Sequence, residues 1–220
     1  MNKPILHPTL IPTVEKVGLN LLKVKPKIFF LKCDVEDLEQ MKIDDGIQVF
    51  FNSPEKEKEQ LIQTIKNGGY VVVAYTEDKT IVGFLVLEEF KIPTRRTFYV
   101  YSYIWDSAIE VSKKWRKKGI ASKLLRFAFK DSFFDDKIVL ARGLTEYWDC
   151  RPHEKEAYRS MLINLAQKVG FKLLPYSPFE DDFLMVRIGP KVDKAITENL
   201  HKIFEEQRKL IMMDYDLPLP

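Results

Sequence analysis

Hydrophobic and polar positions repeat with two different periods along the first half of the chain. The KIFFLKC run at 27–33 predicts a strand, and the segment at 34–67 predicts one helical region. The helix-start and helix-stop signals in this region are Asp34, Ser53-Pro54 and Gly68-Gly69. Helices therefore precede the main run of strands.

Extended periodicity begins after these glycines. YVVVAYT at 70–76 and TIVGFLVLEEF at 80–90 are rich in β-branched and aromatic residues and flank a polar EDK turn, which predicts a hairpin. The next extended run spans 95–111, and its length predicts a bulge or bend near Asp106 and Ser107. A sheet of several strands is the simplest reading of this pattern.

Strands and helices alternate in the second half. Apolar positions at helical spacing predict a helix after Gly119 and another over 152–169, with the KIVLARGL strand at 137–144 between them. FKLLP and FLMVRIG predict two further strands. The apolar face of the later helix consists of Tyr158, Met161, Leu162, Leu165 and Val169.

The two ends of the chain differ from the middle. Four prolines within the first 26 residues predict an extended segment lying over the surface. Residues 191–213 predict a final helix whose apolar stripe either covers a sheet edge or pairs with a second copy in a homodimer. By role, the chain divides into an extension with the first strand (1–30), a core (31–190), and a terminal helix and tail (191–220).

Composition fits a globular protein. The chain has 220 residues, 45% of them hydrophobic, so it can bury a core without disulfides or a structural metal. Its two cysteines, Cys33 and Cys150, are typical of a reducing compartment. No apolar run reaches the roughly 18 residues of a spanning helix. We expect a cytoplasmic protein with no metal and no membrane partner.

Charge argues against a nucleic-acid partner. The 35 basic and 32 acidic residues give a net charge of +3, which is too close to neutral to imply one. The KKWRKK run at 113–118 could grip nucleic acid with Trp115 stacking, but one basic run more often serves a local phosphate or solubility. Cys150 and His153 are sequence neighbours, which does not by itself make a nucleophilic pair.

The segment 108–125 carries the most specific chemistry. It reads as a strand, a short basic loop and a helix, and the first amides of such a helix attract a phosphate. Gly119 and Ala121 are small, so phosphate oxygens can approach the backbone. Arg116, Lys117 and Lys118 add positive charge at the same place.

The run RKKGIA at 116–121 resembles the R/Q-x-x-G-x-G/A motif of the GNAT acetyltransferases, although Lys117 stands where many relatives have glycine. The resemblance implies an α/β protein of the GNAT (acyl-CoA N-acyltransferase) fold, with a central mixed, mostly antiparallel sheet flanked by helices. It also implies acetyl-CoA as acetyl donor. The implied cofactor-binding residues are Ile109, Val111, Arg116, Lys117, Lys118, Gly119, Ile120, Ala121 and Ser122.

A narrower resemblance covers roughly residues 70–205. Its matching segments are AIEV at 108–111, TEYW at 145–148, Tyr158-Arg159 and LMVRIG at 184–189, and they are similar to the acetoin-utilisation acetyltransferases. Members of that family acetylate a lysine of acetyl-CoA synthetase and so switch it off. The resemblance therefore implies a protein lysine as acceptor and acetyl-CoA synthetase as partner.

Acetyl transfer to a lysine needs a group that accepts its proton. Deprotonating an ammonium of pKa ~10.4 at pH 7 costs roughly 4.6 kcal/mol. Glu110 is the first candidate base and Glu146 the second, each with a structural carboxylate as the alternative. A backbone amide within 109–111 would polarise the thioester carbonyl.

The general acid is less clear from the sequence. The tyrosine that GNAT proteins commonly carry four residues before the Gly-Phe after the last core helix is Ala166 here. Tyr158 lies two turns earlier on the same face and is either a core tyrosine or a phenol facing the thiol. Two alternatives stay open: acetylation of a small amine such as a polyamine or antibiotic, and a non-catalytic module that senses CoA.

Overall fold

The computed structural model describes residues 26–93, 98–175 and 182–200, together with 202, 205 and 209. The strands are β1 (Ile28–Lys32), β2 (Lys42–Ile43), β3 (Tyr70–Thr76), β4 (Thr80–Pro93), β5 (Phe98–Val111), β6 (Ile138–Gly143), β7 (Lys172–Leu173) and β8 (Phe183–Ile188). The helices are α1 (Val35–Glu39), α2 (Pro54–Lys66), α3 (Ile120–Ala128) and α4 (Lys155–Gln167). Short 3₁₀ turns occupy Lys113–Trp115, Ser132–Phe134, Thr145–Tyr147 and Pro152–Glu154. The predicted extension at 1–25 lies outside the described residues.

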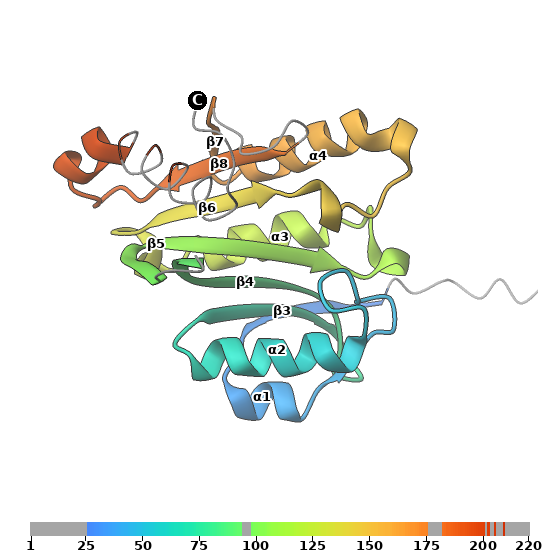
Figure 1. Ribbon diagram of the computed structural model, residues 1–220. Coiled ribbons are helices and arrows are strands. Elements are labelled where there is room, and N and C mark those ends of the chain that lie inside the picture. The colour runs from blue at the N-terminus through green and yellow to red at the C-terminus, as the bar shows by residue number, and fades with distance from the viewer. Residues whose placement is uncertain are drawn as a thin grey trace, which may run out of the picture.

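The strands form one mixed sheet in the order β1-β3-β4-β5-β6-β8-β7, with β2 beside the start of β4 (Figure 1). The pairs β5–β6 and β2–β4 are parallel, and the remaining pairs are antiparallel. The predicted mixed, mostly antiparallel sheet is therefore confirmed.

Local signals explain where the first helices begin and end. Asp34 and Asp37 form a reciprocal capping box at the start of α1, which satisfies two backbone amides. Ser53 caps α2, whose first residue is Pro54. Gly68 follows α2 at φ +84°, a conformation that glycine adopts without strain.

One expectation about this part of the chain is wrong. The helical region predicted over 34–67 is interrupted by β2, because the amides of Lys42 and Asp44 donate to carbonyls of Lys79 and Ile81.

The long strand β5 contains the irregularity that its length predicts. Residues 102–104 have no partner on β4 between the pairs Glu89–Trp105 and Phe90–Tyr101, so the strand bulges a few residues before Asp106. A second register shift lies between Ala74 and Tyr75 of β3.

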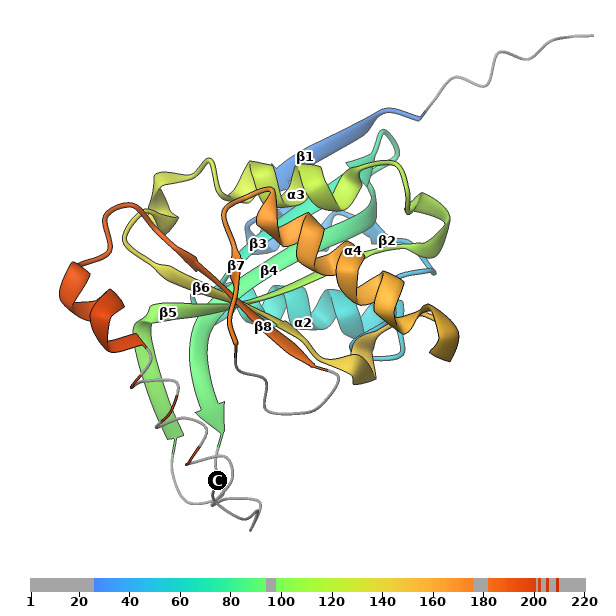
Figure 2. The ribbon, with the colours of Figure 1, turned by 90° about the horizontal axis from the view of Figure 1, so that it is seen from above.

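Helices cover both faces of the sheet. Figure 2 shows α3 and α2 on opposite sides of β3 and β4. The α3 face is built around the fully buried Leu124 and Phe134, and the α2 face around Leu38 and Phe84. Burial of such side chains contributes about 1.5–3 kcal/mol each, so the two layers supply most of the stability.

A third apolar cluster accounts for the terminal helix. Residues 194–200 are helical, and Leu200 packs with Phe90, Ile104 and Leu140 on the face of the sheet. The helix thus covers a sheet face, whereas the sequence pointed to an edge or to a second copy. Most of its predicted continuation to 213 lies outside the described residues.

Candidate functional site

The central strands β5 and β6 are hydrogen-bonded along only part of their length. Their parallel pairing ends at Ser107–Ala141, although β5 continues to Val111 with only β4 as a partner (Figure 1). A cavity of about 1180 Å³ opens at this parting and is lined from α2, β4, β5, β6, α3 and α4. Its walls are mainly apolar and aromatic, which is typical of a small-molecule site.

One end of the cavity is the turn that leads into α3. Lys117 has φ +61° and Gly119 has φ +75°, so the backbone reverses sharply just before the helix. A Cβ on Gly119 would meet no atom within 4 Å, so the space beside this backbone is open. The first amides of α3 have no acceptor within the helix, so the turn presents N–H donors and a positive dipole end.

The implied cofactor residues are distributed unevenly about this turn. Those that line the cavity are Ile109, Val111, Arg116, Lys117, Gly119, Ile120, Ala121 and Ser122. Lys118 lies outside the lining, because its ammonium sits 4.3 Å from the Trp115 ring centroid and donates to the Lys114 carbonyl at 3.0 Å. The turn therefore offers an anion backbone amides more than free cations.

Arg116 serves as a brace within the cavity wall. Its Nε donates to the Val111 carbonyl at 2.9 Å, and Nη1 binds Asp149 at 2.8 Å, where Lys113 also binds at 3.2 Å. Burial alone would raise the pKa of Asp149, but these two cations lower it. Asp149 thus stays ionised and ties the segment after β6 to the turn before α3.

Asp44 braces the same turn from the other side. Its carboxylate accepts from Ser112 Oγ at 2.7 Å and Trp115 Nε1 at 3.3 Å, and pairs with Lys114 Nζ at 2.8 Å. Burial would raise its pKa, but the hydrogen bonds, that of Lys114 first, lower it. Lys113, Lys114 and Arg116 of the basic run are therefore all bound to carboxylates of this chain.

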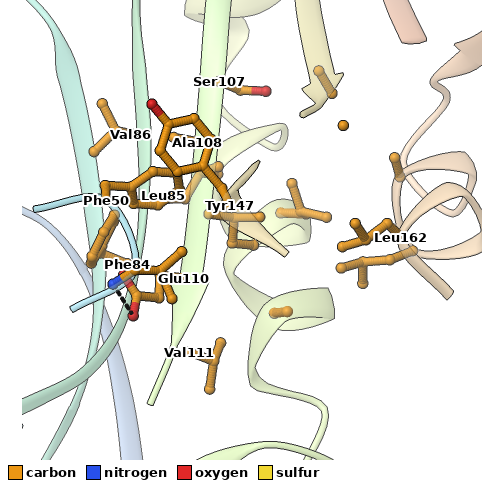
Figure 3. A pocket seen from close by; sticks show the side chains of 18 of the residues that line it. Phe50, Phe84, Leu85, Val86, Ser107, Ala108, Glu110, Val111, Tyr147 and Leu162 are labelled. Atoms are coloured by element: carbon orange, nitrogen blue, oxygen red, sulfur yellow. Dashed lines mark hydrogen bonds between the residues drawn. The ribbon is translucent and has the colours of Figure 1, made fainter. Parts of the chain in front are cut away.

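Glu110 lies deep in the cavity wall near the end of β5. Figure 3 shows its side chain directed toward Phe50 and Phe84, on the opposite side of β5 from Leu162. The residue is 5% exposed, and its carboxylate accepts from the amides of Gln48 at 2.9 Å and Val49 at 3.2 Å. Burial raises its pKa to about 7, so both protonation states are populated at neutral pH.

The other two candidate catalytic residues lie in different surroundings. Glu146 is exposed and is not among the residues that line the cavity. Tyr158 does line it, with its ring 5.8 Å from that of Trp148. Burial raises the pKa of the Tyr158 phenol, so it stays protonated at neutral pH and can donate. Ala166 also lines the cavity and contributes only a methyl group.

Trp148 adds a donor that the sequence did not single out in this role. Among the described residues, its indole Nε1 is the one buried side-chain nitrogen or oxygen without a hydrogen-bond partner. Such an atom is costly unless a ligand or water accepts from it. Because Trp148 lines the cavity, its orphaned N–H fits a site that receives a carbonyl-bearing molecule.

Sequence reasoning also missed the acidic side of the cavity beneath the loop at 47–51. Glu57 is 1% exposed although it stands in the highly charged run PEKEKEQ. One signal existed: Glu57 lies four residues before Leu61, on the apolar side of α2. A glutamate at such a position must be hydrogen-bonded inside the protein.

The described residues give little support to a metal site or a cysteine nucleophile. None of their His, Cys, Asp and Glu side chains form a group of three or more that could hold a metal ion. Burial and the nearby Glu154 raise the pKa of the Cys150 thiol, which makes it a poor nucleophile. Within the same ranges, no helix has the length and apolar character needed to cross a bilayer.

Comparison with known proteins identifies the domain. Residues 67–173 match the family model for the acetyltransferase (GNAT) domain. An acetoin utilization protein from Exiguobacterium sibiricum 255-15 is similar in structure, with a TM-score of 0.71 and 18% identity over 88% of this chain and 99% of that one. A sequence search of curated proteins finds no match.

Two further solved structures carry a donor molecule. A GNAT superfamily phosphinothricin acetyltransferase from Sinorhizobium meliloti, in complex with AcCoA, gives a TM-score of 0.50 and 18% identity over 74% of this chain and 89% of its own. The protein yncA from Salmonella typhimurium, with its cofactor acetyl-CoA, gives 0.50 and 12% over 76% and 96%. These neighbours confirm the expected GNAT fold, and the family match identifies residues 67–173 as an acetyltransferase (GNAT) domain, which is the expected enzyme class.

We expect Glu110 to make the folding stability depend on pH. Its pKa is 4.5 when unperturbed and about 7 in the fold, so the folded state holds the proton more tightly. Stability relative to a Glu110→Gln variant should therefore fall as pH rises from 4.5 to 7, and level off above. The total change is on the order of 3 kcal/mol. Urea unfolding of both proteins across this range measures it, and a constant difference would contradict the assignment.

Proposed function

We propose that this GNAT-domain protein transfers acetyl from acetyl-CoA to an amine, and that the acceptor is a lysine side chain of a protein. The observation that carries this proposal is the buried carboxyl of Glu110, which lines the cavity next to the turn before α3. Its pKa is about 7. A group of that pKa can take a proton from an ammonium and release it to water at neutral pH.

The residues present fit acetyl-CoA. The amides at the start of α3 would hold its diphosphate, because Gly119 and Ala121 leave the backbone accessible. The apolar walls and the unpartnered Trp148 Nε1 suit an amide-bearing chain that runs into the molecule. When bound, acetyl-CoA supplies the thioester that is the acetyl donor. The two neighbours solved with this molecule support the assignment.

The residues of this chain divide the remaining work. Glu110 accepts the proton of the ammonium, directly or through water, and leaves a neutral amine. The edge of β5 beyond Ser107 has no strand partner on the β6 side, so a backbone amide within 109–111 can donate to the thioester oxygen. The neutral phenol of Tyr158 on α4 can donate its proton to the departing CoA thiolate, since Ala166 on the same helix has no proton to give.

The surface around the site supports a protein acceptor. Phe51, Tyr147 and Met161 line the cavity, yet 43%, 39% and 46% of each is exposed. Exposed apolar side chains around a site are a common feature of protein-binding surfaces. The resemblance of AIEV, TEYW and LMVRIG to the acetoin-utilisation acetyltransferases favours acetyl-CoA synthetase as the substrate. The two free cysteines favour the cytoplasm as the location.

Incubation with acetyl-CoA and acetyl-CoA synthetase should therefore yield a synthetase that is acetylated on lysine. Intact-mass and peptide mass spectrometry would detect the gain, with heat-denatured enzyme as the control. Acetylation of polyamines or amino-group antibiotics in its place would identify a small-amine acetyltransferase. Binding of acetyl-CoA with no acceptor turnover would instead indicate a CoA-sensing module.

Replacing Glu110 should remove the base. For the wild type we expect kcat/KM to rise with pH and level off above a midpoint near 7, because the base must be ionised. Glu110→Gln should lower the rate by roughly 10²–10⁴-fold and abolish this midpoint. The matched control is Glu146→Gln, which changes an exposed carboxylate outside the cavity and should keep the wild-type profile. If the control loses the midpoint instead, Glu146 is the base.

Gly119 offers a test of the cofactor end. Gly119→Ala forces a side chain into a left-handed conformation, which costs about 1–2 kcal/mol and distorts the amides before α3. Acetyl-CoA affinity, measured by calorimetry, should fall by about tenfold. Gly170→Ala introduces the same strain at φ +94°, beyond the end of α4, so it should reduce the melting temperature and leave the affinity unchanged. Equal effects on affinity would speak against binding at this turn.

A further inference from the structure

Two buried carboxylates, Glu57 and Glu110, bind the same loop, residues 47–51, on the acceptor side of the cavity. Four successive backbone amides, 48–51, donate to them. Gln48 and Val49 donate to Glu110, and Phe50 and Phe51 both donate to Glu57 Oε1 at 2.8 Å. The two carboxylates come from different elements, Glu57 from α2 and Glu110 from β5.

This loop forms part of the cavity wall. Val49, Phe50 and Phe51 line the cavity, and the Phe50 ring lies 5.2 Å from Tyr147 and 6.3 Å from Phe84 (Figure 3). Its position therefore shapes the space beside Glu110. A carboxylate accepts two amide hydrogen bonds better than a carboxylic acid does, so the state of either glutamate affects how the loop is held.

We propose that Glu57 is a positioning residue for Glu110. Glu57 binds the amides of Phe50 and Phe51 and so holds the loop that also binds Glu110. Its buried negative charge disfavours a negative charge on Glu110. The mechanistic meaning rests on the proposed function, in which Glu110 accepts the proton of the amine. The physical coupling between the two carboxylates does not depend on it.

The groups that face Glu110 from other elements single out Glu57. Arg116, before α3, acts in the opposite direction and lowers the pKa of Glu110, while Asp149 holds its guanidinium. Tyr158, on α4, is uncharged at neutral pH because burial raises its pKa. Glu57 is the neighbouring carboxylate that, after burial, raises the pKa of Glu110.

Coupled carboxylates of this kind are useful to an acyltransferase. Burial raises the pKa of Glu57 too, so the pair binds a proton more readily than either group would alone. When Glu110 takes up a proton, repulsion between the two groups is relieved and its hold on Gln48 and Val49 weakens. The loop that lines the acceptor side thus responds to each proton that the site accepts.

A carboxyl-carbon NMR titration of the full-length protein tests the coupling without any need for catalysis. With glutamates labelled at Cδ, Glu110 is assigned by its loss in Glu110→Gln and should titrate near pH 7 in the wild type. Glu57→Gln keeps an oxygen for the two amides but removes the charge, so the midpoint should fall by about one unit. Glu59→Gln, an exposed glutamate on the same helix, should leave it unchanged.

The carboxyl-carbon signal of Glu57 gives a second measure. Because Glu57 is charged when Glu110 loses its proton, this signal should show a second step at the midpoint of Glu110, and Glu110→Gln should abolish that step. This variant decides the matter if Glu57→Gln does not fold. In the wild type, the amide signals of residues 48–51 should shift with the same midpoint as Glu110. An unchanged Glu110 midpoint in Glu57→Gln, a second step that persists in Glu110→Gln, or amide signals that do not follow the titration would overturn the proposal.

The pH dependence of kcat/KM then distinguishes a positioning role of Glu57 from a purely structural one. In Glu57→Gln the acid limb of kcat/KM should move to lower pH by the same amount as the NMR midpoint, whereas a merely structural residue would lower the rate at every pH. If the wild type transfers no acetyl group to any amine, the proposed function fails, and the NMR titrations still decide the coupling.

Discussion

The hydrogen-bond ladder between β5 and β6 runs over only four residue pairs, from Ile104–Ile138 to Ser107–Ala141. Beyond it, β5 continues as a strand with one bonded edge and one open edge. Backbone groups inside a protein must be satisfied by something, so a parted ladder at the centre of a sheet is a place prepared for a ligand. The cavity lies where the two strands separate, and Glu110 lies on the stretch of β5 that has no strand partner on the β6 side.

Asp44, Asp149, Glu57 and Glu110 are buried or half-buried carboxylates in or beside the cavity wall, and their partners separate their roles. Asp44 and Asp149 contact lysine or arginine, so they stay ionised and brace the turn before α3. The carboxylates of Glu57 and Glu110 accept hydrogen bonds from backbone amides, and burial raises both pKa values. Cation pairing fixes a loop, whereas an amide-bonded carboxyl in an apolar wall stays able to exchange a proton.

The turn before α3 contains a strained residue, Lys117, whose backbone conformation the turn requires. Lys117 adopts φ +61°, where many relatives of the motif have glycine, and a left-handed side chain costs about 1–2 kcal/mol. Asp44 and Asp149 hold the residues on either side through Ser112, Trp115 and Arg116. These contacts over-determine the turn, which is how a strained backbone persists beside a binding site.

The sequence by itself determined the local features of this protein. The caps at Asp34 and Ser53 and the strand alternation are short-range signals, so the helix starts and most strands could be predicted. The resemblance carried by the RKKGIA turn implied the sheet class and named a candidate anion site. Glu110 could be named as a candidate base, but the sequence could not show that it is buried and bonded to backbone amides. Its partners Gln48 and Val49 lie 62 and 61 residues away in the chain.

Only the tertiary structure decided the interior of the site. Glu57 sits among exposed glutamates in a charged run, and its place four residues before Leu61 is the one local sign that it faces inward; the loop at 47–51 that covers it cannot be predicted locally. The same holds for the parting of β5 from β6, the interruption by β2, and the sheet face that Leu200 covers. Capping and periodicity act within a few residues, whereas burial, charge coupling and strand pairing depend on which distant segments the fold brings together.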